Sequence, residues 1–139
     1  MQSSTSNIDR VLASFDDLWN PRILTRANDW DIRLVKVRGE YVWHAHGDTD
    51  ELFLVLDGAL DIHLRETGRP ERCVRLGRND VFVVPRGAEH RPVSDDGATL
   101  MLFEPSGTLT TGDYAGEIPE HITSTTGTLA GEPPAVADR

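Results

Sequence analysis

The chain has 139 residues and a formal net charge of −9 at pH 7, and this length is typical of one domain with its own core. The negative charge disfavours nucleic acid and anionic membrane surfaces as partners, because both attract clustered positive charge. The longest apolar run, Leu52 to Leu56, is far shorter than the roughly 20 residues that span a bilayer, so a membrane-spanning role is excluded.

Cysteine content and the N-terminal sequence both bear on the compartment. The single cysteine, Cys73, cannot form an intrachain disulfide, and Met1 to Arg10 lacks the basic start and apolar segment of a secretory signal peptide. Both features favour a cytoplasmic location. No neighbour marks Cys73 as a nucleophile, so we interpret it as a small apolar strand residue.

Residues 1–21 carry a helical pattern. Ile8, Val11, Leu12, Phe15, Leu18 and Trp19 recur at helical spacing. Ser6 or Asn7 can cap the first turn through a side-chain oxygen. The pattern predicts a short amphipathic helix at the N-terminus.

From Arg22 onward, short β-rich runs alternate with turn residues. Many short strands without intervening helices indicate an all-β antiparallel sandwich or barrel over residues 22–105. The predicted strands are Arg22 to Arg26, Ile32 to Val37, Glu40 to His46, Glu51 to Leu56, Leu60 to Arg65, Arg72 to Leu76, Val81 to Val84, His90 to Val93 and Thr99 to Phe103. Asp96-Gly97 is the turn expected between the last two.

Residues 106–139 are rich in Thr, Gly and Pro and show no sustained periodicity, so they predict an irregular C-terminal tail and not a second domain. Tyr114, Ile118 and Ile122 are the candidate anchors. They could hold the tail on the barrel or on a partner subunit, or the tail could be partly disordered.

The stretch "WHAHGDTDE", Trp43 to Glu51, has the spacing of a metal site. Alternate residues of a strand share a face, so His44 and His46 point the same way. The turn that follows predicts a hairpin whose second strand brings Glu51 back beside them. His90 follows the tight turn Pro85 to Gly87 and is the best candidate for a fourth ligand.

Two motifs in this order resemble those of the cupin superfamily, particularly its small single-domain bacterial members. The motifs are Gly39-x4-His44-x-His46-x4-Glu51-x6-Gly58 and Pro85-x-Gly87-x2-His90, within a resemblance that runs from about Arg33 to Phe103. The usual first motif has five residues between its opening glycine and its first histidine, whereas this chain has four between Gly39 and His44. Ser94 stands near the place of an asparagine that is often found after the last histidine.

The resemblance implies a double-stranded β-helix, or jelly-roll, barrel in which His44, His46, Glu51 and His90 bind a divalent metal. It also implies a homodimer, since small cupins commonly pair their sheets. It does not select a function, because this superfamily includes isomerases, lyases, dioxygenases and non-catalytic binders.

Other candidates have a simpler interpretation. His63 shares the polar face of its strand with Asp61 and Arg65, and His121 has no ligand-spaced partner, so both are expected outside the site. Tyr41 alternates with Trp43 on the face opposite the ligand histidines, which places it away from the metal. Pairs of charged residues flank the ligands and could grip an anionic substrate or assist proton transfer, but a solvated rim explains them equally: Arg86, Arg91, Asp48 and Asp50.

Three imidazoles and one carboxylate suit Fe(II), Mn(II), Ni(II) or Zn(II) and leave one or two positions open. Our first hypothesis is a metal-dependent enzyme that acts on a small oxygenated molecule by isomerisation, lyase chemistry or dioxygenation. The second is a non-catalytic small-molecule binder or sensor. The third is a structural metal that only stabilises the barrel.

Overall fold

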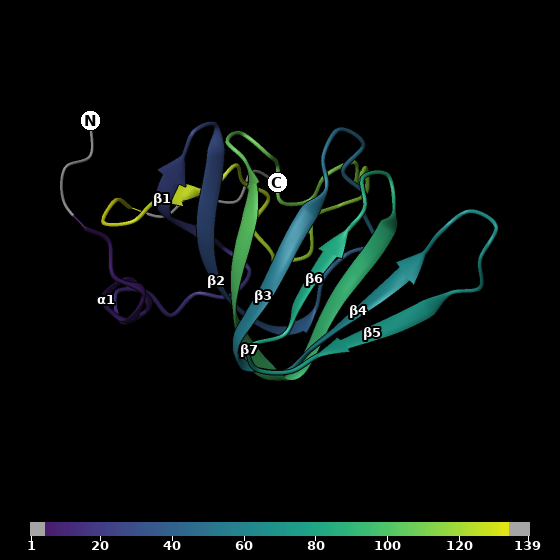
Figure 1. Ribbon diagram of the computed structural model, residues 1–139, viewed down its shortest axis with the longest axis horizontal. Coiled ribbons are helices and arrows are strands. Elements are labelled where there is room, and N and C mark those ends of the chain that lie inside the picture. The colour runs from purple at the N-terminus through teal and green to yellow at the C-terminus, as the bar shows by residue number, and fades with distance from the viewer. Residues whose placement is uncertain (1–4, 134–139) are drawn as a thin grey trace.

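The computed structural model describes residues 5–133, and strands make up nearly all of their regular structure. The elements are α1 (Ile8–Leu12), β1 (Arg22–Ala27), β2 (Trp30–Glu40), β3 (Glu51–Gly58), β4 (Leu60–Arg65), β5 (Arg72–Leu76), β6 (Val81–Val84), β7 (Glu89–Pro105) and β8 (Thr128–Leu129). Figure 1 shows α1 and β1 at one side of the molecule and the β4–β5 hairpin at the other.

The long strand β7 holds the barrel together. Its first part pairs with β4, and its second part pairs with both β2 and β3. The strands follow the order β5-β4-β7-β2-β1-β8, while β3 joins β6 to β7. This arrangement of curved antiparallel strands is a jelly roll, so the all-β prediction is confirmed.

One predicted turn proved to be part of a strand. Residues 90–93 and 99–103 were expected as separate strands, but β7 runs through both without a reversal. The pairing register with β2 shifts between Val37 and Gly39, which leaves extra residues in β7 near Gly97. Gly97 adopts a φ of +102°. A bulge, which glycine accommodates at positive φ, therefore replaces the expected turn.

Strand alternation builds the core as the sequence predicts. In β4, Leu60, Ile62 and Leu64 are fully buried, while Asp61 and His63 between them are partly exposed. Burying a leucine or isoleucine side chain of this kind contributes about 1.5–3 kcal/mol. The period-two pattern thus selects which face of β4 lines the barrel.

The N-terminal helix is shorter than its apolar pattern suggests. It has five residues, none of them buried, and the Asn7 side chain accepts a hydrogen bond from the Arg10 backbone N–H. Further along, Phe15 and Trp19 are buried outside any helix. The Trp19 backbone N–H and indole N–H donate to carbonyl oxygens of β2. Hydrogen bonds to β2 therefore replace the helical ones that the pattern predicts.

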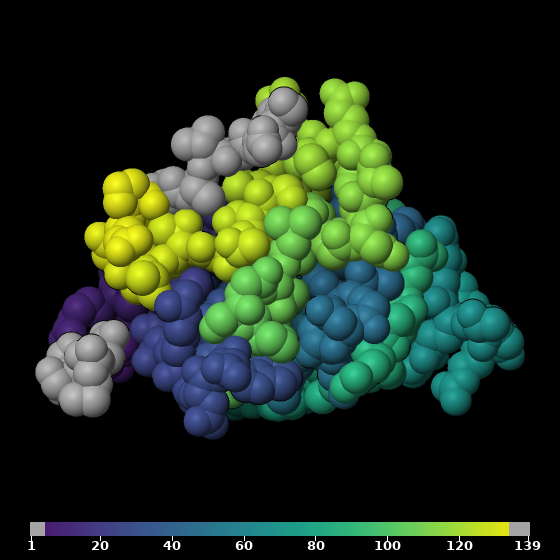
Figure 2. Space-filling view, turned by 90° about the horizontal axis from the view of Figure 1, so that it is seen from above, coloured from purple at the N-terminus to yellow at the C-terminus, as the bar shows by residue number. Residues whose placement is uncertain are grey.

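The tail lies on its own barrel. Ile122 is fully buried, and Tyr114 and Ile118 pack against the core, which confirms the three predicted anchors. The two residues of β8 pair in parallel with β1. Figure 2, seen from above, shows this segment, in light green to yellow, spread over the barrel. The described part of the tail is thus ordered and contains little regular structure.

No helix among residues 5–133 has the length and apolar character needed to cross a membrane.

Candidate metal centre

Four side chains converge inside the barrel: those of His44, His46, Glu51 and His90. One potential ligand atom from each lies within 4.8 Å of those of the others. All four residues are buried, and His90 is completely inaccessible to solvent. The structure thus brings together the candidate ligands of both sequence motifs.

Backbone pairing between the two motifs creates this convergence. The His44 N–H donates to the His90 carbonyl at 3.0 Å, and the His90 N–H donates back to the His44 carbonyl at 2.8 Å. One step further, the Gly87 N–H donates to the His46 carbonyl at 2.8 Å. These bonds fix the relative positions of the three imidazoles.

The predicted hairpin between the first histidine strand and β3 is wrong. Residues 41–43 are irregular, and His44 forms an isolated bridge with His90. Strand β3 pairs instead with β6 and β7. These two strands, and not the segment that carries His44 and His46, therefore position Glu51 at the cluster. Strand register depends on the burial of a whole face, and a local turn signal does not reveal that burial.

Backbone carbonyls orient two of the imidazoles. His44 Nδ1 lies 2.9 Å from the Val42 carbonyl, and His90 Nδ1 lies 2.9 Å from the Ala88 carbonyl. A carbonyl only accepts, so each Nδ1 carries the proton and each Nε2 keeps its lone pair for the cluster. This is the tautomer that coordinates a metal through Nε2.

The donor set fits a divalent cation. His90 Nε2 lies 3.2 Å and His46 Nε2 3.6 Å from the same oxygen of Glu51. The buried His46 Nε2 has no hydrogen-bond partner in the described part of the chain. A cation shared by these nitrogen and carboxylate donors would satisfy this atom and offset the cost of burying the Glu51 charge.

Burial keeps the imidazoles neutral. It lowers the pKa of His44 well below its ordinary value, with a further contribution from neighbouring His90. Burial also lowers the pKa values of His46 and His90. The same desolvation raises the pKa of Glu51, and a hydrogen bond with Glu104 and the charge of Arg33 oppose that shift. Three neutral imidazoles at neutral pH are in the form that coordinates metal.

Two residues beside the cluster were not anticipated from the sequence. Glu104 is 1% exposed, and its Oε1 accepts a hydrogen bond from the buried guanidinium of Arg33 at 2.9 Å. Both are in phase with core residues of their strands, Arg33 with Val35 and Glu104 with Leu102. The sequence did carry a signal for this pair: one positive and one negative residue occupy core-facing positions of two strands, where an unpaired charge would be costly.

Tyr41 does not lie on the face predicted for it. Its ring centroid is 5.2 Å from that of His44 and 4.8 Å from that of Trp19. The prediction that Tyr41 points away from the ligands assumed strand alternation through residues 41–43, which are irregular. Tyr41 therefore adjoins the candidate metal centre.

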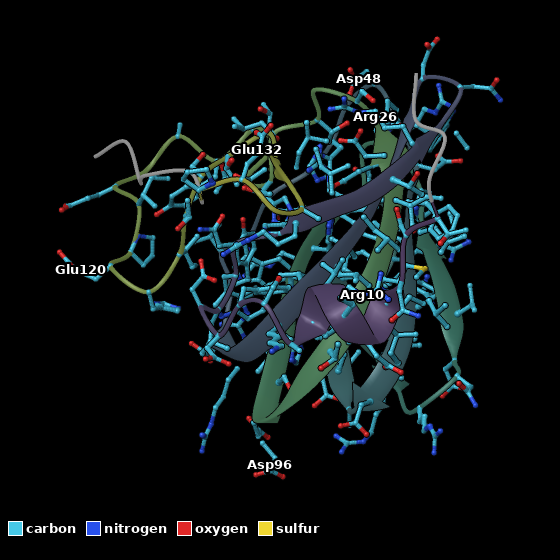
Figure 3. All side chains as sticks on the ribbon, turned by 90° about the vertical axis from the view of Figure 1, so that its left-hand side faces the viewer. Arg10, Arg26, Asp48, Asp96, Glu120 and Glu132 are labelled. Carbon is cyan, nitrogen blue, oxygen red and sulfur yellow. The ribbon has the colours of Figure 1, made fainter. Side chains whose placement is uncertain are left out.

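Two hollows adjoin the cluster. An inner cavity of about 40 Å³ is lined by His44 and Glu51 together with Tyr41 and Glu104. An outer groove of about 360 Å³ is lined by His46 and by loop and tail residues that include Asp48. Figure 3 shows Asp48 at one end of the barrel and Asp96 at the other. The outer groove thus lies at the Asp48 end.

The remaining candidates lie outside the cluster. His63 packs edge-on against Trp43, with ring centroids 6.5 Å apart, and His121 Nε2 bonds to the Glu40 carbonyl. Cys73 is exposed on β5, in contrast to the apolar position expected for it. Charged residues of the rim pair with one another or stack on Trp43: Arg86 with Asp50, Arg91 with Glu40, and Arg65 over the Trp43 ring.

Sequence and structure comparisons identify relatives of this chain. A family model described as a cupin domain matches residues 33–104. YdbB of Bacillus subtilis (strain 168), described as uncharacterized, is 40% identical over 68 residues, which span 49% of this chain and 57% of YdbB. The match thus covers little more than half of that relative's length.

Solved structures share the fold. A cupin-2 domain containing protein from Shewanella frigidimarina NCIMB 400 is 37% identical, with a TM-score of 0.66 over 71% of this chain and 92% of that one. A hydroquinone 1,2-dioxygenase from Sphingomonas sp. TTNP3, in complex with 4-nitrophenol, is 23% identical, with a TM-score of 0.65 over 75% of this chain and 33% of that one. The second likeness shows the fold alone. Because the family model covers more than half of the chain and the barrel brings the histidines of both motifs together, this protein belongs to the cupin family.

Proposed function

We propose that this cupin is a metal-dependent enzyme that acts on a small oxygenated molecule. The observation that carries the proposal is the convergence of His44, His46, Glu51 and His90 within 4.8 Å, with hollows lined by some of these residues. A purely structural metal needs no adjoining space, because structural sites are closed by their ligands. The hollows therefore favour a site that a substrate can enter.

The donor set restricts the chemistry. Imidazole and carboxylate donors suit iron, manganese, nickel or zinc in the divalent state, and such an ion polarises carbonyl groups or binds dioxygen. The protein itself orients His44 and His90 through their Nδ1 hydrogen bonds and excludes bulk water by burying all four ligands. The only cysteine, Cys73, is exposed on β5 and lies outside the cluster. Isomerisation, lyase chemistry and dioxygenation all fit these features.

Metal content is the first test. Protein purified without added metal and without a metal-binding tag is expected to contain close to one divalent ion per chain. After dialysis against a mild chelator, His90→Ala is expected to lose this ion, because the variant lacks one coordinate bond. His121→Ala, whose imidazole bonds to the Glu40 carbonyl instead, serves as the matched control. Equal metal content in wild type and His90→Ala would contradict the proposed ligand set.

Turnover separates an enzyme from a binder. Metal-loaded and metal-stripped protein are compared on a panel of small hydroxy acids, hydroxy ketones and catechols. Metal-dependent conversion of one class is the expected result. Stoichiometric binding without conversion of any compound would instead support the alternative, a small-molecule binding or sensing cupin.

We also propose that two copies pair through the outer face of the β6-β3-β7-β2 sheet. Pairing registers align two apolar rows across these strands: Val83, Leu52, Phe103 and Ile32 in one, and Val81 and Leu54 in the other. Met101 and Leu34 continue the second row but are already buried within the chain. Val81 and Val83 are 56% and 43% exposed. Copies with a net charge of −9 can meet across these uncharged rows without like-charge contact. An apolar sheet face is also complementary to itself.

A further inference from the structure

We propose that Asp113, in the tail, is a positioning residue that aligns the candidate ligands His44 and His46 for the metal. Its carboxylate is not one of the four clustered side chains. It acts through the backbone of Ala45, the residue between the two histidines. This inference rests on the proposed function, because it concerns the same ligand set.

Two hydrogen bonds join Asp113 to Ala45. The Ala45 N–H donates to Asp113 Oδ1 at 2.7 Å, and the Asp113 N–H donates to the Ala45 carbonyl at 3.1 Å. A hydrogen bond to a carboxylate is shorter and stronger than one between neutral groups. One tail residue therefore pairs with both polar groups of the Ala45 backbone.

The segment that carries the two histidines depends on this support. Residues 41–50 form no strand apart from the bridge between His44 and His90. In an antiparallel pair, neighbouring residues direct their backbone groups to opposite sides. His44 pairs with His90 on one side, so the Ala45 backbone faces the tail on the other. The tail thus takes the place of a neighbouring strand.

Gly112 brings the tail into direct contact with this segment. A Cβ at Gly112 would collide with the Ala45 carbonyl and lie 3.2 Å from Cδ2 of the His44 ring. The turn that carries Asp113 is itself held in place, because the buried Thr111 side chain hydrogen-bonds to the Ser124 hydroxyl at 2.7 Å. Asp113 therefore acts on Ala45 from a fixed support.

A loss of this support should weaken metal binding. Without Asp113 Oδ1, the Ala45 N–H loses its acceptor, and the backbone between His44 and His46 gains freedom to rotate. The two imidazoles then no longer meet the metal in one geometry. Removing a group that orients metal ligands without touching the metal typically lowers metal affinity about 10–100-fold.

Asp113 also carries a charge near the cluster, and two substitutions separate that charge from the hydrogen bond. Burial lowers the pKa values of His46 and His90, and the charge of Asp113 opposes both shifts. Asp113→Asn keeps an acceptor oxygen at the same place and removes the charge. Asp113→Glu keeps the charge and displaces the oxygens by one methylene group.

The test measures cobalt(II) affinity by competition with a chromophoric chelator, on protein whose folding is verified by tryptophan fluorescence. Asp113→Ala and Asp113→Glu are expected to bind cobalt(II) about tenfold more weakly than the wild type, and Asp113→Asn within about twofold of it. The visible absorption of fully loaded Asp113→Glu should also differ from that of the wild type, because the metal geometry changes. Thr111→Val is the matched control, since it loses a hydrogen bond within the tail and should keep wild-type affinity and absorption.

Weak binding by Asp113→Asn together with wild-type binding by Asp113→Glu would overturn the proposal in favour of a charge effect. An equal loss of affinity in Asp113→Ala and Thr111→Val would also overturn it, because Asp113 would then only stabilise the tail. If Asp113→Ala does not fold, the contrast between the Asn and Glu variants decides alone. A wild type that takes up no cobalt(II) would refute the proposed function, and this inference with it.

Discussion

Replacement of Arg33 by methionine tests the buried charge network that supports the site. The Arg33 side chain is inaccessible to solvent and donates to Asp31, Glu104 and the carbonyl oxygens of Thr108 and Thr126 at 2.8–3.1 Å. Two strands and the tail therefore meet at a single guanidinium group. The variant keeps an unbranched apolar stem but removes every one of these donors.

The magnitude follows from what each partner loses. Asp31 keeps hydrogen bonds from Arg26 and Ser106, whereas Glu104 loses the hydrogen bond and the positive charge that Arg33 supplies. Breaking a buried ion pair typically costs about 3–5 kcal/mol, and two carbonyls also lose a donor. We expect a loss of about 4 kcal/mol from a total stability of about 5–15 kcal/mol.

Urea unfolding followed by tryptophan fluorescence measures this loss. With a slope of about 1.5 kcal/mol per molar urea, the midpoint is expected to fall by about 2–3 M. Arg26→Met is the matched control, because its side chain is 47% exposed and donates to the same Asp31. An ion pair of that kind contributes less than about 1 kcal/mol. Midpoints that fall by the same small amount in both variants would refute the claim that the buried network stabilises the fold.

Three further predictions concern the site wall, acid stability and assembly. Gly112 has a φ of +54°, and a Cβ there would collide with the Ala45 carbonyl, so Gly112→Ala is expected to weaken metal retention at least tenfold. Gly107→Ala, at a φ of +88° but with open space around it, should retain metal as the wild type does, and equal retention by both variants would contradict the steric argument. Burial raises the pKa of Asp31, but arginine and serine donors bring it below 3.8 overall, so its stabilising contribution is present above pH 3.8 and lost below. Urea midpoints of Asp31→Asn should therefore lie below those of the wild type at pH 7 and converge with them as the pH falls below 3.8, whereas a constant difference would disprove this. Light scattering at micromolar concentration should show a dimer for the wild type and a monomer for Val83→Lys, and a monomeric wild type would remove the proposed interface.

The sequence by itself determined the features that depend on local geometry. The period of two in Leu60 to Arg65 predicted which side chains of β4 face the core, and the burial of alternate residues confirms that prediction. The spacing of His44, His46 and Glu51, with His90 after its tight turn, marked all four candidate ligands before any contact was known. These patterns are readable because alternation and turn chemistry act over a few residues.

Only the tertiary structure decided which segments meet. His44 pairs with His90, 46 positions along the chain, and not with the neighbouring strand β3. That pairing leaves Tyr41 in an irregular segment beside the ligands. The contact between Arg33 and Glu104 likewise joins β2 to the far end of β7. Such contacts depend on the register that buries a whole sheet face, and that register results from the packing of all the strands together, because a shift of one residue would turn every inward side chain outward.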